Sequence, residues 1–400
     1  MHSFSHLLSR VRSNLISWSH KGVNNIDSAL IHTESEIHHL EQSDSNPNIF
    51  AILMEHYAKL STLQLQYNTK CAQRARLLWL KDGDKNTNFF HNTIRIRSHA
   101  NFISQIEDLD GNVFCSHADI NSTFLNFYQN LWTAPTEIHM DILKALPSDL
   151  PRLSDSDGAH LIREVTKEEV YATLMDLPSG KSPGPDGFNV EFFRNFWHFI
   201  GDHLFAAIHH FFVTACLPST WGNTFIALIP KKDNSKLVSD FRPISLCNVC
   251  FKIISKILAN RLKIVLPDLI SREQVGFVPG RCSFNNIITV QEIAHSIERD
   301  TIGFPRMLIK IDIEKAYDTL NWSAILAVLT KMNFSPTWIS WISFCLKSSS
   351  FSLLINGVPT PWFHSFRGVR QGDPISSYLF ILVSQILSSL LNFGLNSGMI

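Results

Sequence analysis

The stretch Leu308-Ile309-Lys310-Ile311-Asp312-Ile313-Glu314-Lys315-Ala316-Tyr317-Asp318 carries the most information about the fold of this 400-residue chain. Its apolar residues predict a β-strand over residues 307–313, with Asp312 at the end of the strand and the ring of Tyr317 five residues further on. A carboxylate held on a rigid strand is a suitable ligand for Mg²⁺. An Asp that ends a strand and caps the next helix is also common, so a purely structural role remains open.

A second informative segment lies downstream and reads Arg367-Gly368-Val369-Arg370-Gln371-Gly372-Asp373-Pro374. It predicts a glycine-rich turn that leads into an apolar helix. Gly372 would let the backbone approach a ligand closely, and the start of a helix favours negative charge. The alternative is a tight turn that Asp373 caps.

A third segment lies upstream, where the strand predicted over residues 225–229 ends at Pro230 and is followed by Lys231 and Lys232. Arg242 precedes Pro243 about ten residues later. Two lysines and a fixed arginine can bind phosphates. A solvated basic hairpin without a ligand would have the same composition.

The charges of the chain are balanced overall but unevenly distributed. The 35 basic residues equal the 35 acidic ones, which argues against a uniformly basic nucleic-acid-binding protein. Residues 70–97 and 226–263 nevertheless carry local excesses of five and six positive charges. Such stretches suit a polyanion, but they also occur as solvated faces of helices.

The seven cysteines form no disulfide framework, and no signal peptide is recognisable, so we expect an intracellular protein in the nucleus or cytoplasm. Cys247 and Cys250 lack a second pair of zinc ligands at finger spacing. Polar residues interrupt the apolar stretch over residues 375–395, which therefore predicts a buried helix and no membrane partner.

Helices and strands mix without a regular alternation, which predicts an α+β fold. Residues 1–100 have helical periodicity, and Asp110-Gly111 predicts a hairpin. Thr166 and Glu169 predict a capping box. Further predicted helices cover residues 190–214, 251–266, 285–299, 323–332 and 337–346, and predicted paired strands cover 351–355 and 362–366. The aromatic helix over 192–212 is interpreted as core rather than as a base-stacking platform.

The order and spacing of these segments resemble the reverse transcriptases of plant-type non-long-terminal-repeat (LINE-like) retrotransposons. Lys181–Phe188 resembles the loop before the fingers, and Gln274–Arg281 resembles the block inserted between fingers and palm. Trp79–His91 is similar to the linker between endonuclease and polymerase in plant elements. The resemblance spans about residues 70–400 and implies a right-hand polymerase fold. It implies a helical linker region over 1–150, fingers over 151–300 and a partial palm over 301–400.

The resemblance also implies roles for individual residues. Asp312 would bind two Mg²⁺ ions, and the carbonyl of Ile313 would complete part of the coordination shell of the second ion. Tyr317 would exclude ribonucleotides from the sugar position. Gln371 and Gly372 would lie along the incoming nucleotide, while Lys231 or Lys232, together with Arg242, would contact its triphosphate. Asp318 and Asp373 would be structural, through hydrogen bonds to nearby backbone.

The implied reaction is RNA-templated DNA synthesis, with an RNA template, a DNA primer and deoxynucleoside triphosphates as partners. The oligomeric state is unknown. The aromatic-Ala-Asp-Asp tetrad that relatives carry after the Gln-Gly turn does not occur downstream of Gln371. One carboxylate holds two divalent ions poorly, so we expect no polymerisation by this polypeptide alone. The alternatives are a catalytically dead remnant that still binds nucleic acid and a fragment that folds poorly.

Overall fold

The structure is a computed structural model that describes residues 2–19, 26–42, 49–75, 92, 95–96, 100–108, 110–133, 150–299 and 307–398. The chain forms two compact units. One consists of residues 1–5 and 105–400, and the other of residues 6–104. The resemblance at Trp79–His91 and most of the basic stretch over 70–97 lie outside the described residues.

The smaller unit is helical, as the periodicity predicted. Helices α2 (Ile26–Glu41) and α3 (Ile49–Ala75) pack against each other, with Ile26 and Ile37 buried between them. The hydroxyl of Tyr57 on α3 donates a 2.5 Å hydrogen bond to Glu41 on α2. Helix α1 covers His2–Trp18.

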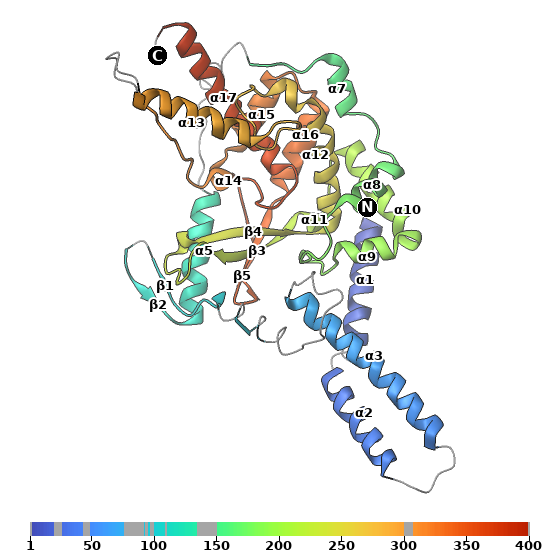
Figure 1. Ribbon diagram of the computed structural model, residues 1–400. Coiled ribbons are helices and arrows are strands. Elements are labelled where there is room, and N and C mark those ends of the chain that lie inside the picture. Colours follow the sequence, from blue (N-terminus) through green and yellow to red (C-terminus); the bar gives the residue numbers. More distant parts are fainter. Residues whose placement is uncertain are drawn as a thin grey trace. The chain divides into compact units, whose positions relative to one another are not determined.

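A five-stranded sheet forms the centre of the larger unit (Figure 1). Strands β3 (Asn223–Pro230) and β4 (Phe241–Cys247) are antiparallel neighbours, and β3 also pairs in parallel with β5 (Ser350–Ile355). Both short strands β6 (Val358–Pro359) and β7 (Phe363–His364) pair with β5. The strands predicted over residues 225–229, 351–355 and 362–366 are therefore confirmed, and the combination of this sheet with many helices is an α+β fold.

Strand β5 lies more than 100 residues after β3, yet the two are adjacent. It belongs to the part of the chain expected to form the palm, whereas β3 belongs to the expected fingers. Its residues Phe351, Leu353 and Ile355 are buried, as expected for a strand whose sheet is covered by other elements. One sheet thus joins segments from both sequence regions.

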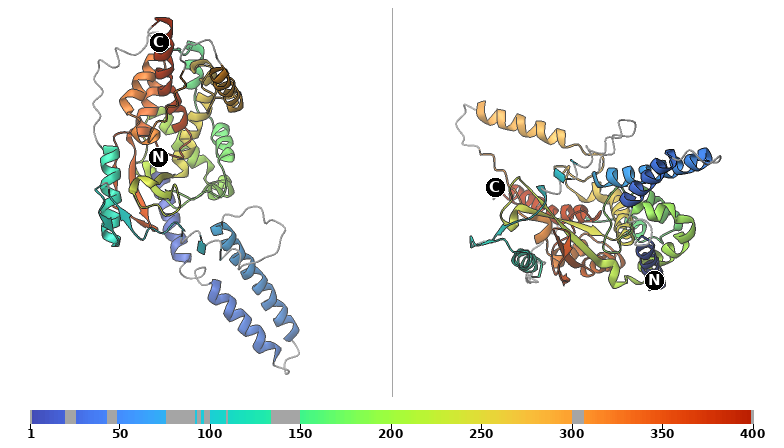
Figure 2. Two further views of the ribbon diagram at one scale, coloured as in Figure 1. Left: turned by 60° about the vertical axis from the view of Figure 1, so that its left-hand side comes forward. Right: turned by 90° about the horizontal axis from the view of Figure 1, so that it is seen from below.

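Helices cover the sheet and supply most of the core (Figures 1 and 2). The central one, α12 (Val249–Leu269), buries 14 of its side chains, which explains why its sequence is apolar on nearly every face. Around it lie the remaining helices of this layer: α8 (Lys167–Asp176), α10 (Trp197–Thr214), α15 (Trp322–Lys331), α16 (Pro336–Lys347) and α17 (Ser376–Asn396).

Local sequence signals explain where several of these helices begin. The side chain of Thr166 accepts a hydrogen bond from the backbone N–H of Glu169, which confirms the predicted cap of α8. Ser335 caps α16 in the same way and is followed by Pro336 at the first helical position. These caps satisfy backbone donors that would otherwise lack partners.

The predicted aromatic helix over residues 190–214 is divided in two. Helices α9 (Val190–Asn195) and α10 meet at Phe196. Phe193, Phe211 and Phe212 are buried, as predicted, but Phe199 is 70% exposed. The interpretation of this segment as core therefore holds for one face only.

Smaller elements complete the larger unit. Strands β1 and β2 form the hairpin predicted around Asp110-Gly111, and α5 stands beside the sheet in Figure 1. These elements are β1 (Ile106–Glu107), β2 (Val113–Phe114), α5 (His117–Thr133), α7 (Asp155–Leu161), α11 (Ser219–Gly222), the 3-10 helix η2 (Val238–Asp240), α13 (Ser283–Arg299) and α14 (Ala316–Thr319).

The strand predicted over residues 307–313 is absent, and this prediction is wrong for the structure. The segment has no strand assignment, and its apolar side chains are exposed, Ile311 by 72%. A strand requires a neighbour that accepts and donates backbone hydrogen bonds, and no described strand pairs with this segment. Apolar composition favours an extended backbone here but cannot supply the neighbour.

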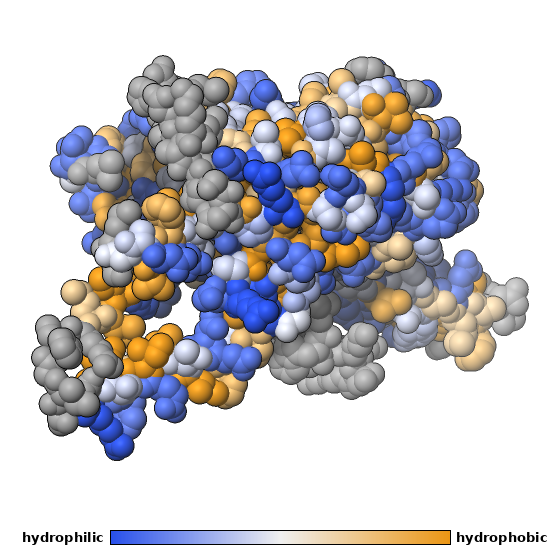
Figure 3. All heavy atoms as spheres, turned by 90° about the horizontal axis from the view of Figure 1, so that it is seen from above, coloured by the Kyte–Doolittle hydropathy of each residue, from blue (hydrophilic) through white to orange (hydrophobic). Residues whose placement is uncertain are grey.

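Further hydrophobic surface lies on α13 and on the second half of α17. Helix α13 buries none of its residues, and Figure 2 shows it projecting from the body of the larger unit. Figure 3, which looks down on the top of Figure 1, shows hydrophobic side chains open to solvent among hydrophilic ones. The exposed apolar residues of the two helices are Phe284, Ile287, Ile288, Val290, Ile293, Leu387, Leu390, Leu391, Phe393 and Leu395.

Helix α17 was expected to be a buried helix. Its first half is buried through Leu379, Ile381 and Leu382, but its second half is largely exposed. Among the described residues, α17 is the one helix whose length and apolar composition would allow it to cross a membrane. This is weak evidence for a membrane span, because the core helices of soluble proteins pass the same test.

Candidate functional site

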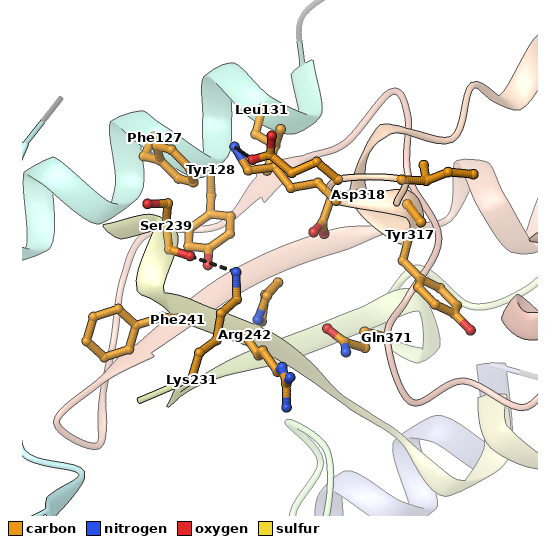
Figure 4. A pocket seen from close by; sticks show the side chains of 15 residues that line it. Phe127, Tyr128, Leu131, Lys231, Ser239, Phe241, Arg242, Tyr317, Asp318 and Gln371 are labelled. Atoms are coloured by element: carbon orange, nitrogen blue, oxygen red, sulfur yellow. Dashed lines mark hydrogen bonds and ion pairs between the residues drawn. The ribbon is translucent and has the colours of Figure 1, made fainter. Parts of the chain in front are cut away.

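A pocket of about 320 Å³ opens between the β3–β4 hairpin, α5 and the segment that follows residue 312 (Figure 4). Five of the eight residues singled out from the sequence line it, from three separate parts of the chain. These residues are Lys231, Arg242, Ile313, Tyr317 and Gln371. The pocket walls also include Phe127, Tyr128, Leu131, Ser239, Phe241, Pro243, Glu314, Lys315, Ala316 and Asp318.

The β3–β4 hairpin brings two cations to one side of the pocket. The strands pair in a register that places Ile229 opposite Arg242, so Lys231 follows β3 at the same end. Lys231 is anchored by its backbone N–H, which donates to the carbonyl of Asp240, and its Nζ donates to the carbonyl of Ser239 at 2.8 Å. Lys231 and Arg242 are both exposed, and Figure 4 shows both of them at the pocket.

Lys232 does not line this pocket. Its Nζ forms a 3.0 Å ion pair with Asp240, inside the turn of the hairpin. The two lysines lie in the bend that follows β3, and the ion pair with Asp240 directs the Lys232 side chain away from the residues that line the pocket. The structure therefore separates two residues that the sequence left as alternatives.

The Gln371 turn is joined to the segment around Tyr317 by backbone hydrogen bonds. The N–H of Val369 donates to the carbonyl of Tyr317 at 2.8 Å, and the N–H of Gly368 donates to Leu320 at 2.7 Å. On its other side, the carbonyl of Gln371 accepts from the N–H of Ser245 on β4 at 2.9 Å. Gln371 is thus fixed between the hairpin and the Tyr317 segment.

Two glycines make this turn possible. Gly368 has a φ of +82°, and a Cβ at this position would lie 2.8 Å from the carbonyl oxygen of Asp318. Gly372 has a φ of +104° and is exposed. Other residue types rarely adopt such backbone conformations. Gly372 follows the pocket residue Gln371 in the sequence but does not itself line the pocket.

Two charged side chains of this turn, Arg370 and Asp373, are buried, and no sequence argument identified them together. Arg370 donates to the carbonyl of Cys345 at 2.9 Å and to that of Gly222 at 3.1 Å, and its guanidinium lies 4.2 Å from the centre of the Phe251 ring. Burial raises the pKa of Asp373 to about 6, although the Arg370 guanidinium opposes this rise. Asp373 was expected to be held by hydrogen bonds to nearby backbone, but its carboxylate is hydrogen-bonded to the side chain of Ser255 and lies within the electrostatic influence of Arg370.

Asp312, the expected metal ligand, lies on the exposed segment and does not line the pocket, whereas its neighbour Ile313 does. Among the residues that the structure describes, no group of three or more His, Cys, Asp or Glu side chains could hold a metal ion. The described carboxylates therefore do not form a two-ion site.

Tyr317 lies between the pocket and the first turns of α17. Its hydroxyl is 3.0 Å from the hydroxyl of Ser377, and its ring stacks on Phe380 with centroids 5.8 Å apart and planes at 21°. In Figure 4 its ring points away from Lys231 and beyond Gln371.

Asp318 is the functional candidate that sequence reasoning undervalued. Its carboxylate accepts a 3.1 Å hydrogen bond from the indole nitrogen of Trp132, a residue of α5, rather than from nearby backbone. Burial raises the pKa of Asp318 to about 6, while the Trp132 bond and the charges of Lys315 and Lys231 act in the opposite direction. Asp318 thus adds a buried carboxyl group to the pocket, within the electrostatic influence of Lys315 and Lys231.

Helix α5 was not singled out from the sequence either. It buries Phe124, Tyr128 and Trp132 on one face, and Trp132 packs against Phe351 of β5 and Phe363 of β7. The spacing of four residues between these aromatics is a readable signal for a buried helix face. The position of α5 at the pocket could not be predicted from the sequence, because the bond between Trp132 and Asp318 joins residues 186 positions apart.

The positive charge over residues 226–263 does not form a single cationic surface. Arg261 is buried and binds Glu169 through a 2.7 Å ion pair, and Lys256 pairs with Asp176 at 2.9 Å. These pairs hold α12 to α8. Of this stretch, Lys231 and Arg242 line the pocket, where Lys315 of the Tyr317 segment is a third lining cation.

Comparison with known proteins adds an independent observation. Residues 229–396 match the model of the reverse transcriptase (RNA-dependent DNA polymerase) family. This chain carries a reverse transcriptase domain. The matched range begins at the end of β3 and includes the Tyr317 segment, the Gln371 turn and α17, but not α5.

Relatives of this reverse transcriptase domain include proteins of animal transposable elements. The chain is 30% identical over 309 residues to the transposon TX1 uncharacterized 149 kDa protein of Xenopus laevis, which covers 77% of the chain and 23% of that protein. It is 24% identical over 241 residues to a Pol polyprotein of retrotransposable element R2 from Popillia japonica, covering 58% and 31%. The chain thus spans less than a third of these relatives, and its domain is of the non-long-terminal-repeat type.

Proposed function

We propose that the pocket binds the triphosphate of an incoming deoxynucleotide during RNA-directed DNA synthesis. The observation that carries this proposal is the convergence of Lys231, Arg242, Gln371 and Tyr317 on one pocket of the reverse transcriptase domain. Two exposed cations at one side of a concave surface attract a polyphosphate, and they are held by a hairpin whose geometry is fixed. The partners would be an RNA template, a DNA primer and deoxynucleoside triphosphates.

The residues of the pocket would act by positioning and charge neutralisation rather than by forming a covalent intermediate. Lys231 and Arg242 would neutralise phosphate oxygens. Gln371, fixed through Ser245 and the Tyr317 segment, would lie along the nucleotide. Tyr317 would face the sugar and exclude a 2′-hydroxyl.

Divalent metal ions are general in this family, and two Mg²⁺ ions would supply charge stabilisation at the reacting phosphate. In this chain Asp312 and the carbonyl of Ile313 are the candidate ligands. The described residues do not fit such a centre, because no cluster of potential ligands surrounds Asp312 among them. We therefore assign no step to the metal ions and expect the 400-residue chain alone to give no primer extension.

Finer assignments are also part of this proposal. The plant-type subtype is supported by the likeness at Trp79–His91. We propose a helical linker region over 1–150, fingers over 151–300 and a partial palm over 301–400, with the β5–β7 strands contributing to the sheet of the fingers. We further propose a nuclear or cytoplasmic location without a membrane partner.

The test is a set of competition titrations with the purified chain and a fluorescent deoxynucleotide. We expect dTTP to compete about ten times better or more than dTMP, and thymidine to compete weakly, because each phosphate adds charge-assisted contacts. Equal competition by the three would contradict the proposal. A primer-extension assay with an oligonucleotide-primed RNA and Mg²⁺ accompanies it, and cDNA product would contradict the expected inactivity.

A further inference from the structure

The side chain of Tyr317 is held by two residues of α17 rather than by its own segment. Its hydroxyl lies 3.0 Å from the Ser377 hydroxyl, and its ring stacks on that of Phe380. Ser377 and Phe380 are three positions apart and therefore share one face of the helix. A polar contact at the tip and a stacked contact on the face together fix the orientation of a ring that has only two free torsions.

The backbone around this contact is fixed as well. The carbonyl of Tyr317 accepts the N–H of Val369, and Ser376, at the start of α17, is buried. Ile375 donates its backbone N–H to the hydroxyl of Ser255 on the central helix α12 at 3.2 Å. The beginning of α17 is thus anchored to the core, so it provides a rigid support for the Tyr317 ring.

We propose that Ser377 and Phe380 are positioning residues that set where the Tyr317 ring lies, and thereby determine how strongly the pocket discriminates between deoxyribonucleotides and ribonucleotides. This inference rests on the proposed function, because it assigns the sugar side of the same pocket. Loss of either contact frees the ring to move away from the sugar. The pocket then accepts a 2′-hydroxyl more readily, while the phosphate contacts of Lys231 and Arg242 are unchanged.

The measured quantity is the ratio of the dissociation constants for ATP and dATP, determined by titration of the full chain. The wild type is expected to prefer dATP. Ser377→Ala is expected to lower the ratio about fivefold, the usual effect of one hydrogen bond, without a large change in the affinity for dATP. Ser377→Thr keeps a hydroxyl and is expected to restore the ratio. Ser384→Ala, two turns further along α17, is the matched control and leaves the ratio unchanged.

A double-mutant cycle separates positioning from a general effect on folding. Tyr317→Phe removes the hydroxyl that Ser377 contacts, so Ser377→Ala is expected to have no further effect on the ratio in that background. Phe380→Leu is expected to lower the ratio in both backgrounds, because it removes the stacked ring instead. Thermal unfolding of each variant shows whether the chain remains folded.

Two outcomes contradict this inference in different ways. If the wild type binds dATP with selectivity and Ser377→Ala and Phe380→Leu leave that selectivity intact, the positioning role is wrong and the proposed function stands. If the folded wild type binds neither nucleotide, the proposed function itself fails, and the inference fails with it.

Discussion

The indole nitrogen of Trp132 donates a 3.1 Å hydrogen bond to the carboxylate of Asp318 across 186 positions of sequence. This bond joins α5, which precedes the matched reverse transcriptase range, to a segment that lines the pocket. Phe127 and Tyr128 of the same helix line the pocket. Helix α5 is therefore part of the structure of the site, although the family match does not include it.

Replacement of Trp132 by Phe is expected to lower the free energy of unfolding by about 1–3 kcal/mol. The change removes the donor to Asp318 and reduces the contacts with Phe351 and Phe363. Urea denaturation followed by circular dichroism measures it. Trp362→Phe is the control, because Trp362 is 45% exposed and stacks on Phe225 at the surface. Equal effects of the two changes would contradict the role given to Trp132.

Stability is expected to depend on pH through Asp318, whose pKa burial raises to about 6 from an ordinary 3.8. A proton is then bound more tightly in the folded chain than in the unfolded one. The resulting stabilisation is full below pH 4 and is lost as the pH rises through 6, a difference of roughly 3 kcal/mol at most. Asp318→Asn is expected to be more stable than the wild type at pH 7.5 and to vary less between pH 4 and 7.

The comparison requires unfolding curves at several pH values for both proteins. Asp373 has a pKa raised to a similar value by burial and remains in the variant, so part of the pH dependence is expected to persist. An Asp318→Asn variant that is less stable than the wild type at pH 7.5 would show that the charge of Asp318 stabilises the fold.

Removal of Arg370 is expected to be severe. Arg370→Met deletes the hydrogen bonds to Cys345 and Gly222 and leaves Asp373 buried without its neighbouring cation. Leaving a buried charge without its neighbouring countercharge costs about 3–5 kcal/mol. The double variant Arg370→Met with Asp373→Asn is expected to recover part of that loss, because no buried charge then remains. Thermal unfolding measures whether stability is recovered in the double variant. If the stability losses of the two single variants simply add, the coupling between Arg370 and Asp373 is contradicted.

Gly368→Ala is expected to destabilise the chain by about 2–4 kcal/mol and to weaken nucleotide binding. The new Cβ would lie 2.8 Å from the carbonyl oxygen of Asp318, at a φ of +82°. Gly398→Ala is the control, because its φ is also positive but nothing lies within 4 Å of the added carbon. Similar unfolding midpoints for both variants would show that the close approach of the turn to Asp318 is not needed.

Local patterns were sufficient for much of the fold. Pro230 ends β3 and the basic residues follow it in a hairpin, because a strand end and its turn depend on neighbouring residues. The caps at Thr166 and the glycines of the Gln371 turn were predictable for the same reason. The convergence of these segments was expected only through a family resemblance, since no local pattern encodes contacts between distant segments.

The remaining features depend on tertiary partners. Residues 307–313 have the composition of a strand but no strand beside them among the described residues. The choice between Lys231 and Lys232 depends on the ion pair of Lys232 with Asp240, and the contact of Tyr317 depends on Ser377, 60 positions away. Such pairings are decided by packing, so a single sequence leaves them open.

The most direct test of the central claim is calorimetric titration of dTTP into the wild-type chain and into the variant with Lys231→Gln and Arg242→Gln. If these two side chains bind the triphosphate, the double variant is expected to bind dTTP about 100-fold more weakly, while Lys232→Gln, whose side chain pairs with Asp240, changes the affinity by less than about threefold. Unchanged binding of dTTP by a folded double variant would contradict the assignment of this pocket.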